Sequence, residues 1–186
     1  MDARLQAIAK PVTLGRMAFR AALDPPNTEL FIVSRAAMDE AVAYSRQSPR
    51  RRVIKPFHRD ESEALHRMFN AVQPDSYIRP HRHLDPPKSE AWIVLRGAVL
   101  FFTFEDDGRI RETVKLAANG DAFGVDLTPG VYHTFLALEP DTVIFEIKNG
   151  PYVAATDKAF APWSPVEGSP EASEFMQRLR DAFEKR

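Results

Sequence analysis

The chain has 186 residues, 44% of them hydrophobic, which is enough to bury one sizeable core but too few for two independent domains. Its 25 Lys and Arg nearly balance 26 Asp and Glu, so nothing in the net charge favours a nucleic acid or an anionic membrane as partner. The absence of cysteine excludes disulfides and thiolate metal sites. No apolar run approaches the roughly 20 residues needed to span a bilayer, and the N-terminus lacks a signal-peptide core, so we expect a soluble, cytoplasmic protein.

The first elements precede the main domain. Residues 1–29 mix Arg, Ala and Pro without periodicity and end in turn-forming residues, which predicts an N-terminal extension. Hydrophobic residues then recur at helical spacing after Ser34, a suitable N-cap, and stop at Ser48, so a helix is expected over about 35–47. We interpret the arginine triplet at 50–52 as a solvated turn, in preference to a specific anion site.

The segment 61–72, ESEALHRMFNAV, fits a helix or a strand, and its periodicity does not decide between them. After Pro74 the chain becomes clearly β, with aromatic and β-branched runs separated by Gly, Pro and Asp. Asp107-Gly108 between two such runs predicts a hairpin. Short strands that recur every 8 to 12 residues are typical of a sandwich or barrel.

The C-terminal part is expected to cover this barrel. Residues 150–168 carry three prolines and several aromatic residues without periodicity, which predicts an ordered wrapping loop. Ser169 and Pro170 are suitable N-cap and first-turn residues of a closing helix. One face of this helix is hydrophobic: Ala172, Phe175, Met176, Leu179 and Phe183.

The stretch PHRHLDPPKSEAWIVLRG, residues 80–97, contains the candidate metal ligands. Side chains alternate along a strand, so His81 and His83 share one face and can converge on one ion. Glu90, on the strand that returns after the DPPK turn, is the third candidate ligand, and His133 on a later strand is the fourth. Three imidazoles and one carboxylate suit Fe, Mn, Co, Ni or Zn and leave up to two coordination positions open.

These residues are similar to the two cupin motifs. His81, His83, Glu90 and Gly97 match the first motif, and the sequence PGVYH, ending at His133, matches the second. The gap of six residues between His83 and Glu90 is longer than in most cupins. Glu90 therefore joins the site only if the DPPK turn bulges enough to keep it in register.

Longer phrases resemble the WbuC family of cupin fold metalloproteins. They include RMFNAVQPDSYIRPHRHLDPPKSEAWIVLRG and PGVYHTFLALEPDTVIFEIKNGPY, and the resemblance covers roughly residues 30–183. It implies a mainly β, cupin-type double-stranded β-helix (jelly-roll barrel) with flanking N- and C-terminal helices, a bound metal, a strand at RMFNAV and a homodimer. The expected segments are an extension at 1–29, a helix and lead-in at 30–60, a cupin barrel at 61–150, and a tail with a helix at 151–186.

Further residues are candidates for the pocket. Arg79 is expected on the ligand face, where its guanidinium could hold a carboxylate or phosphate, although an outward salt bridge is the alternative. Glu146 faces either the interior, as a general base or a partner of a ligand histidine, or the outside. His58 resembles a histidine that the family carries ahead of its barrel and could reach the pocket mouth, or it has a surface or structural role, whereas His66 is placed at the surface. Aromatic candidates for the pocket wall or the core are Tyr77, Trp92 and Phe135.

WbuC genes lie among surface-polysaccharide (O-antigen) genes, so the resemblance implies a metal-dependent protein that acts on a small polar substrate such as a sugar or sugar nucleotide, in an isomerase- or epimerase-like reaction. An Fe(II)-dependent dioxygenase suits the same ligands. A non-catalytic small-molecule binding or regulatory protein is the alternative from a different class. No nucleic acid and no membrane span is expected in any of these cases.

Overall fold

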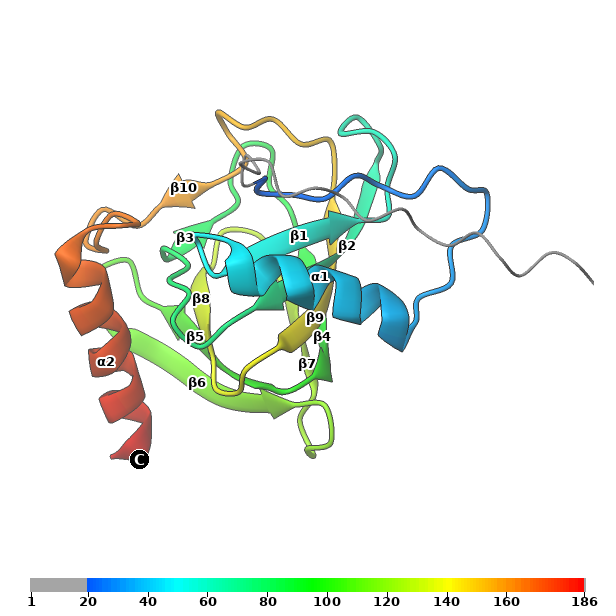
Figure 1. Ribbon diagram of the computed structural model, residues 1–186. Coiled ribbons are helices and arrows are strands. Elements are labelled where there is room, and N and C mark those ends of the chain that lie inside the picture. The colour runs from blue at the N-terminus through cyan, green and yellow to red at the C-terminus, as the bar shows by residue number, and fades with distance from the viewer. Residues whose placement is uncertain (1–19, 186) are drawn as a thin grey trace, which may run out of the picture.

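A computed structural model describes residues 20–185 of the chain and shows a β barrel with one helix on each of two sides (Figure 1). Two five-stranded sheets form the barrel, and every neighbouring pair of strands is antiparallel. The first sheet has the order β1 (Arg52–Pro56), β2 (Leu65–Val72), β9 (Thr142–Asn149), β4 (Glu90–Arg96) and β7 (Gly124–Leu127). The second has the order β10 (Ala159–Phe160), β3 (His81–Arg82), β8 (Tyr132–Ala137), β5 (Ala98–Phe104) and β6 (Ile110–Ala117).

The chain crosses between the sheets at almost every connection from β2 to β10, so the inner faces of both sheets enclose one interior. This strand order confirms the mainly β, cupin-type jelly roll. The hairpin predicted at Asp107-Gly108 joins β5 to β6, and Gly108 has the positive φ of 89° that its turn requires.

The segment that fitted a helix or a strand is the strand β2, as the family resemblance implied. Its residues are buried on both faces: Met68 and Val72 point one way, while Phe69 and Ala71 pack under the N-terminal helix. A strand that is apolar on both faces shows no two-residue alternation, which is why periodicity left the question open.

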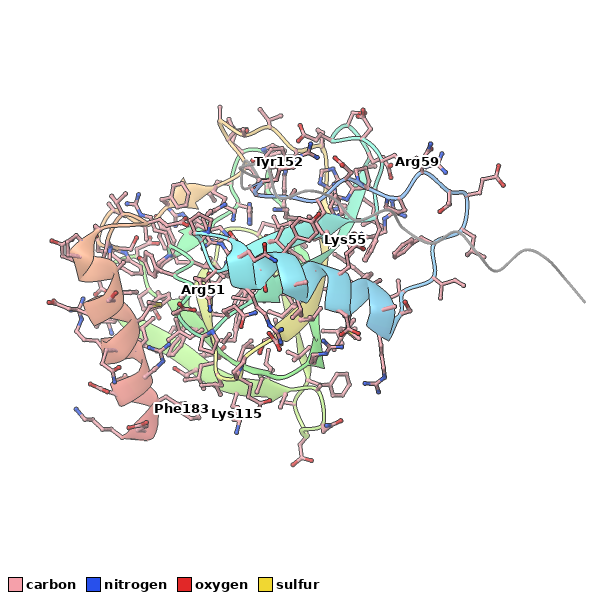
Figure 2. All side chains as sticks on the ribbon, in the orientation of Figure 1. Arg51, Lys55, Arg59, Lys115, Tyr152 and Phe183 are labelled. Atoms are coloured by element: carbon pink, nitrogen blue, oxygen red, sulfur yellow. The ribbon has the colours of Figure 1, made fainter. Side chains whose placement is uncertain are left out.

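Both predicted helices are confirmed. Helix α1 (Arg35–Gln47) begins after Ser34, whose Oγ accepts a hydrogen bond from the backbone N–H of Ala37. It packs on the outer face of the first sheet, and its Glu40 pairs at 2.8 Å with Lys55 of β1, which Figure 2 labels beside the helix. Helix α2 (Pro170–Glu184) covers the outer face of the second sheet with the predicted hydrophobic stripe.

The arginine triplet is a solvated turn only in part: Arg50 and Arg51 lie at a turn with 47% and 37% of their side chains exposed, whereas Arg52 begins β1 and is 14% exposed. Arg50 and Arg52 both pair with Glu167 in the tail, at 2.7 and 2.8 Å, and Arg51 pairs with Asp75 at 2.9 Å. The prediction missed these ion pairs because Asp75 is 24 residues away and Glu167 reaches Arg50 and Arg52 only when the tail folds back.

The predicted extension at 1–29 lies mostly outside the described residues. Of the part that the structure describes, Leu23 is buried beneath α1, and its backbone N–H donates to the carbonyl of Ile54 in β1 at 2.8 Å. This part of the segment therefore packs against the barrel.

The contact between α2 and the second sheet is open to a direct test. Leu179 is 4% exposed beneath this helix, so Leu179→Ala leaves a cavity and is expected to lower the free energy of unfolding by about 2–5 kcal/mol. Urea unfolding measures the change. Glu174→Ala on the exposed face of α2 is the control and should change stability by less than about 0.5 kcal/mol. Equal stability of both variants would show that α2 does not pack as described.

Candidate metal centre

Four side chains meet at one end of the barrel interior: His81, His83, Glu90 and His133. One ligand atom from each lies within 4.8 Å of the other three, and no residue of the group is more than 4% exposed. His81 of β3 lies directly opposite His133 of β8, while Glu90 enters from the first sheet at the start of β4. The structure thus brings together the four side chains that the sequence motifs predict.

The tautomer of each imidazole follows from its hydrogen bond to the backbone. Nδ1 of His81 faces the carbonyl oxygen of Arg79 at 2.9 Å, and Nδ1 of His133 faces that of Val131 at 2.9 Å. Nδ1 of His83 contacts the carbonyl oxygen of Asp157. A carbonyl only accepts, so each Nδ1 carries the hydrogen and each Nε2 presents a lone pair.

The lone pairs face one another without a donor between them. Nε2 of His133 lies 3.5 Å from Oε2 of Glu90, and Nε2 of His83 contacts Oε1 of the same carboxylate. Nε2 of both histidines and Oε2 of Glu90 are buried and have no hydrogen-bond partner within residues 20–185. Buried acceptors without donors are unfavourable, and a cation bound between them would remove this cost. The residues therefore fit a divalent metal.

The charge states of Glu90 and His81 agree with a metal site. Burial would raise the pKa of Glu90, but this pKa lies well below its usual range, and the charge of Lys148, 3.9 Å from Oε1, contributes to the lowering. Burial, followed by the nearby Lys158 charge, lowers the pKa of His81 well below its usual value. A neutral imidazole and an ionised carboxylate are the forms that bind metal ions.

Asp157 in the tail connects the cluster to the DPPK turn. Its carboxylate binds Lys88 at 2.8 Å and Lys148 at 3.2 Å, while its carbonyl holds His83. Both side chains of the Lys88–Asp157 pair are almost completely buried, at 1% and 2% exposure. The long turn after His83 is therefore anchored in the interior through Lys88, two residues before Glu90.

Two more charged groups face the cluster. Nζ of Lys148 is 3.9 Å from Oε1 of Glu90 and 3.8 Å from Oε1 of Glu146. In β10 the neighbours of Lys158 pair with β3, Ala159 with Arg82 and Phe160 with His81, so alternation places Lys158 on the face of His81. Lys158 keeps solvent-accessible surface, yet protein atoms surround its ammonium closely enough for desolvation to lower its pKa.

Sequence reasoning missed Lys88, Asp157 and Lys158. Each stands in a polar, turn-rich stretch, where charged residues are normally solvated, and no local signal marks them as buried or as facing the site. Lys148 had one local signal, since its alternation with Phe145 and Ile147 leaves either pair facing inward.

Among the other predicted pocket residues, Glu146 and Trp92 lie beside the cluster. Glu146 faces the interior and accepts a hydrogen bond from Nδ2 of Asn70 at 2.6 Å; burial and the charge of Glu90 raise its pKa. The ring of Trp92 lies 5.6 Å from that of His133, and Phe135 packs against the far side of Trp92 at 5.1 Å. Trp92 therefore separates the polar end of the interior from the apolar end.

Tyr77 and Arg79 do not share a strand with the histidines, because β3 begins at His81. The hydroxyl of Tyr77 donates to the carbonyl of Pro165 at 2.9 Å, and its ring packs beneath α2, away from the cluster. Nε of Arg79 donates to Ser164 at 3.0 Å, and its guanidinium lies over the ring of Phe160. Its contribution to the site is its carbonyl, which holds His81.

His58 and His66 form a pair of their own outside the four-residue group. Their rings stack at 4.0 Å, and neither is more than 9% exposed. The surface position predicted for His66 is wrong: the residue is 2% exposed, and its Nε2 faces the carbonyl of Glu61.

Comparisons with known proteins return low similarities. A family model described as a domain of unknown function (DUF6016) matches residues 33–116, less than half of the chain. No curated protein sequence matches. Among residues 20–185, neither helix has the length and apolar character needed to cross a membrane.

Three solved structures illustrate the structural similarity. An oxalate decarboxylase variant of Bacillus subtilis is 15% identical over 66% of this chain and 29% of its own, with a TM-score of 0.44. KdgF of Halomonas sp. is 17% identical over 55% and 83%, with a TM-score of 0.42. The capsular polysaccharide assembling protein CapF of Staphylococcus aureus is 18% identical over 58% and 27%, with a TM-score of 0.42. The chain spans less than a third of the oxalate decarboxylase, and its own strand order carries the fold assignment.

The ion pairs of Asp157 lead to a stability prediction. Asp157→Ala leaves Lys88 and Lys148 buried without their shared carboxylate, so we expect the free energy of unfolding to fall by about 3–5 kcal/mol. Urea denaturation at pH 7 measures the loss. Asp121→Ala, at an exposed turn, removes the same group and should stay within about 0.5 kcal/mol of the parent. A loss below about 1 kcal/mol for Asp157→Ala would contradict a structural role for these pairs.

Proposed function

We propose that His81, His83, Glu90 and His133 bind one divalent transition metal, of the group Fe, Mn, Co, Ni and Zn, and that the protein acts there on a small polar substrate. The substrate class we favour is a sugar or sugar nucleotide of surface-polysaccharide (O-antigen) assembly. The supporting observation is the convergence of buried acceptor atoms without a donor. Three imidazole nitrogens and one carboxylate oxygen suit these metals better than Ca²⁺ or Mg²⁺, which prefer oxygen ligands.

A metal with open positions supplies Lewis acidity toward a substrate carbonyl or hydroxyl. The chain's own residues have separate tasks around it. The carbonyl of Asp157 fixes the orientation of His83, and Trp92 closes the interior toward its apolar end. Glu146 is the candidate group for holding a proton, because burial and Glu90 raise its pKa and Asn70 fixes one of its oxygens. Arg79, which the sequence suggested as a group that positions the substrate, is instead engaged by Ser164 of the tail.

We also propose that two copies pair as a homodimer through the outer face of β4. Helix α1 covers the other part of this sheet, whereas Ile93 and Leu95 of β4 and the adjacent Phe123 are exposed at 41%, 36% and 53%. Exposed apolar side chains grouped on one face are typical of protein interfaces.

Sedimentation of the purified protein is expected to give the mass of a dimer, and Ile93→Lys should shift it toward the 21.0 kDa monomer because a charge would be buried at the interface. Val166→Lys, at an exposed position of the tail, is the control and should leave the dimer intact. A monomeric parent protein would refute the pairing.

Elemental analysis of protein purified from metal-replete medium is expected to give about one transition metal per chain. His81→Ala combined with His83→Ala should abolish this metal while the β circular dichroism persists, because the ligands lie inside a barrel with a separate apolar core. His58→Asn is the control, since His58 lies outside the group. Metal retained by the double variant, or lost from His58→Asn, would place the ligands elsewhere.

Metal-loaded protein incubated with a panel of sugars and sugar nucleotides under nitrogen is expected to convert one of them, and air should not change the rate. This follows from a reaction driven by Lewis acidity, which consumes no oxygen. Mass spectrometry and NMR of the products measure the conversion, with the double histidine variant as control. A strict requirement for oxygen would assign a dioxygenase, and tight binding without conversion would assign a binding protein.

A further inference from the structure

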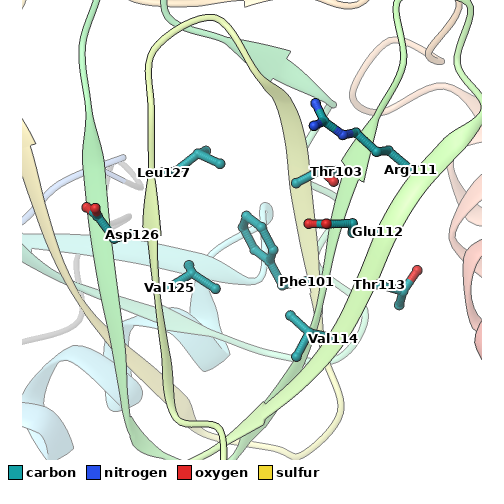
Figure 3. Close-up of a pocket in the computed structure, with 9 residues that line it drawn as sticks. All are labelled: Phe101, Thr103, Arg111, Glu112, Thr113, Val114, Val125, Asp126 and Leu127. Carbon is teal, nitrogen blue, oxygen red and sulfur yellow. The ribbon is translucent and has the colours of Figure 1, made fainter.

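A cavity of about 350 Å³ lies between the two sheets, beside the edge strands β6 and β7 (Figure 3). This volume is within the range of small-molecule sites. Its apolar wall consists of Phe101, Val114, Val125 and Leu127. Its polar wall consists of Thr103, Arg111 and Glu112, whereas Thr113 and Asp126 line it only with their backbone side, because alternation points their side chains to the outer faces of the sheets. The mixture of an aromatic and aliphatic surface with a few charged groups suits an amphipathic ligand.

The cavity adjoins the candidate metal centre. Thr103 of β5 lies directly opposite His133 of β8, and Leu127 of β7 lies directly opposite Glu90 of β4. Residues opposite each other on antiparallel strands point to the same face, so both cavity residues stand beside a metal-ligand candidate. The ring of Phe101 also stacks near that of His133, with centroids 6.1 Å apart.

Polar groups in the cavity wall have no partners within the protein. Thr103 is only 6% exposed, and its Oγ1 is buried without a hydrogen bond. At the solvent-exposed rim, the side chains of Arg111 and Glu112 form no hydrogen bond or ion pair with any of residues 20–185, and Figure 3 shows both directed toward the space between the strands. A buried hydroxyl without a partner is unfavourable unless a ligand or water satisfies it.

A β-bulge gives Arg111 its position. Thr103 pairs with Glu112, but the next residue, Phe104, pairs with Ile110, so Arg111 is the extra residue of β6. Bulges redirect a side chain at the rim of a barrel and are frequent beside active sites. The irregular register is thus the reason why an arginine at the sheet edge lines the cavity.

We propose that this cavity binds a small hydroxylated anion, such as a sugar acid or sugar phosphate, next to the metal centre. Arg111 would hold the carboxylate or phosphate, Glu112 and Thr103 would bind hydroxyl groups, and Phe101 would pack against the apolar face of the ring. This inference rests on the proposed function, because it names the substrate class of the same site.

The charges favour an anion over a cation. A guanidinium binds a carboxylate or phosphate through two parallel hydrogen bonds, and Arg111 is unpaired and available for this. Glu112 accepts hydrogen bonds from hydroxyl groups. A divalent cation bound beside the cavity would outweigh the single carboxylate of Glu90, and Lys148 and Lys158 add positive charge nearby.

Calorimetric titration of metal-loaded and metal-free protein tests the proposal with four probes: D-glucuronate, glucose 6-phosphate, glucose and glucosamine. At least one of the two anionic probes is expected to bind ten-fold or more tightly than glucose, and the tighter one identifies the anionic group. Equal binding of all four probes, or tightest binding of glucosamine, would overturn it.

Two variants locate the binding. Arg111→Met is expected to weaken the preferred anion at least ten-fold, because it removes a charged hydrogen bond, and Thr103→Val about five-fold through loss of one hydroxyl. Lys115→Met removes an exposed positive charge from the same strand and should leave the affinity unchanged. Figure 2 labels Lys115 at the end of the barrel away from Tyr152. Unchanged affinity in Arg111→Met would place the anion elsewhere.

The position beside the metal has its own readout. In protein shown by elemental analysis to hold Mn²⁺, this paramagnetic ion is expected to broaden the proton NMR lines of the bound anion. Lines that are not broadened would show that the anion does not lie beside the metal. If the protein holds no metal, the proposed function fails, but titration of metal-free protein and its Arg111→Met variant still decides whether the cavity binds the anion.

Discussion

Buried acceptor atoms that face one another, with no donor among them, are the constraint on which the rest of the structure depends. The lone pairs of the histidine Nε2 atoms and the Glu90 oxygens converge because three backbone carbonyls occupy the Nδ1 atoms. The imidazoles then have no hydrogen left to present to the interior. Such an arrangement is unfavourable on its own and becomes favourable around a cation, so the surrounding chain must hold it in place.

The interior of the barrel is divided to meet this requirement. One end is filled with hydrophobic side chains, and Trp92, which contacts both His133 and Phe135, forms the boundary. Beyond it, Lys88 and Lys148 bind Asp157, and Asn70 binds Glu146. The hydrophobic end of the interior has a low dielectric constant, which strengthens the electrostatic interactions at the neighbouring polar end. Each buried charge there therefore needs a partner. The cavity beside β6 is where polar groups remain without one.

The candidate metal centre is flanked on one side by the tail and on the other by the edge strands β6 and β7. Residues 157–161 run beside β3, where they hold His83 through a carbonyl and pair with His81. On the opposite edge, β6 and β7 are the last strands of their sheets among residues 20–185, and the cavity lies beside them. The side covered by the tail supports the ligands, while the side with the bulge at Arg111 leaves room for a small molecule.

Local patterns in the sequence were sufficient for helices α1 and α2 and the hairpin at Gly108, because capping and turn chemistry act over a few residues. The choice of the four converging residues came from the similarity of their spacing to known motifs, and the position of Glu90 still depended on how the DPPK turn folds. Only the tertiary structure decided the roles of Lys88 and Asp157, which are 69 residues apart, and the burial of His66. It also moved Tyr77 beneath α2 and engaged Arg79 with the tail. These outcomes depend on which distant segment folds against a residue, and the sequence around that residue carries no record of it.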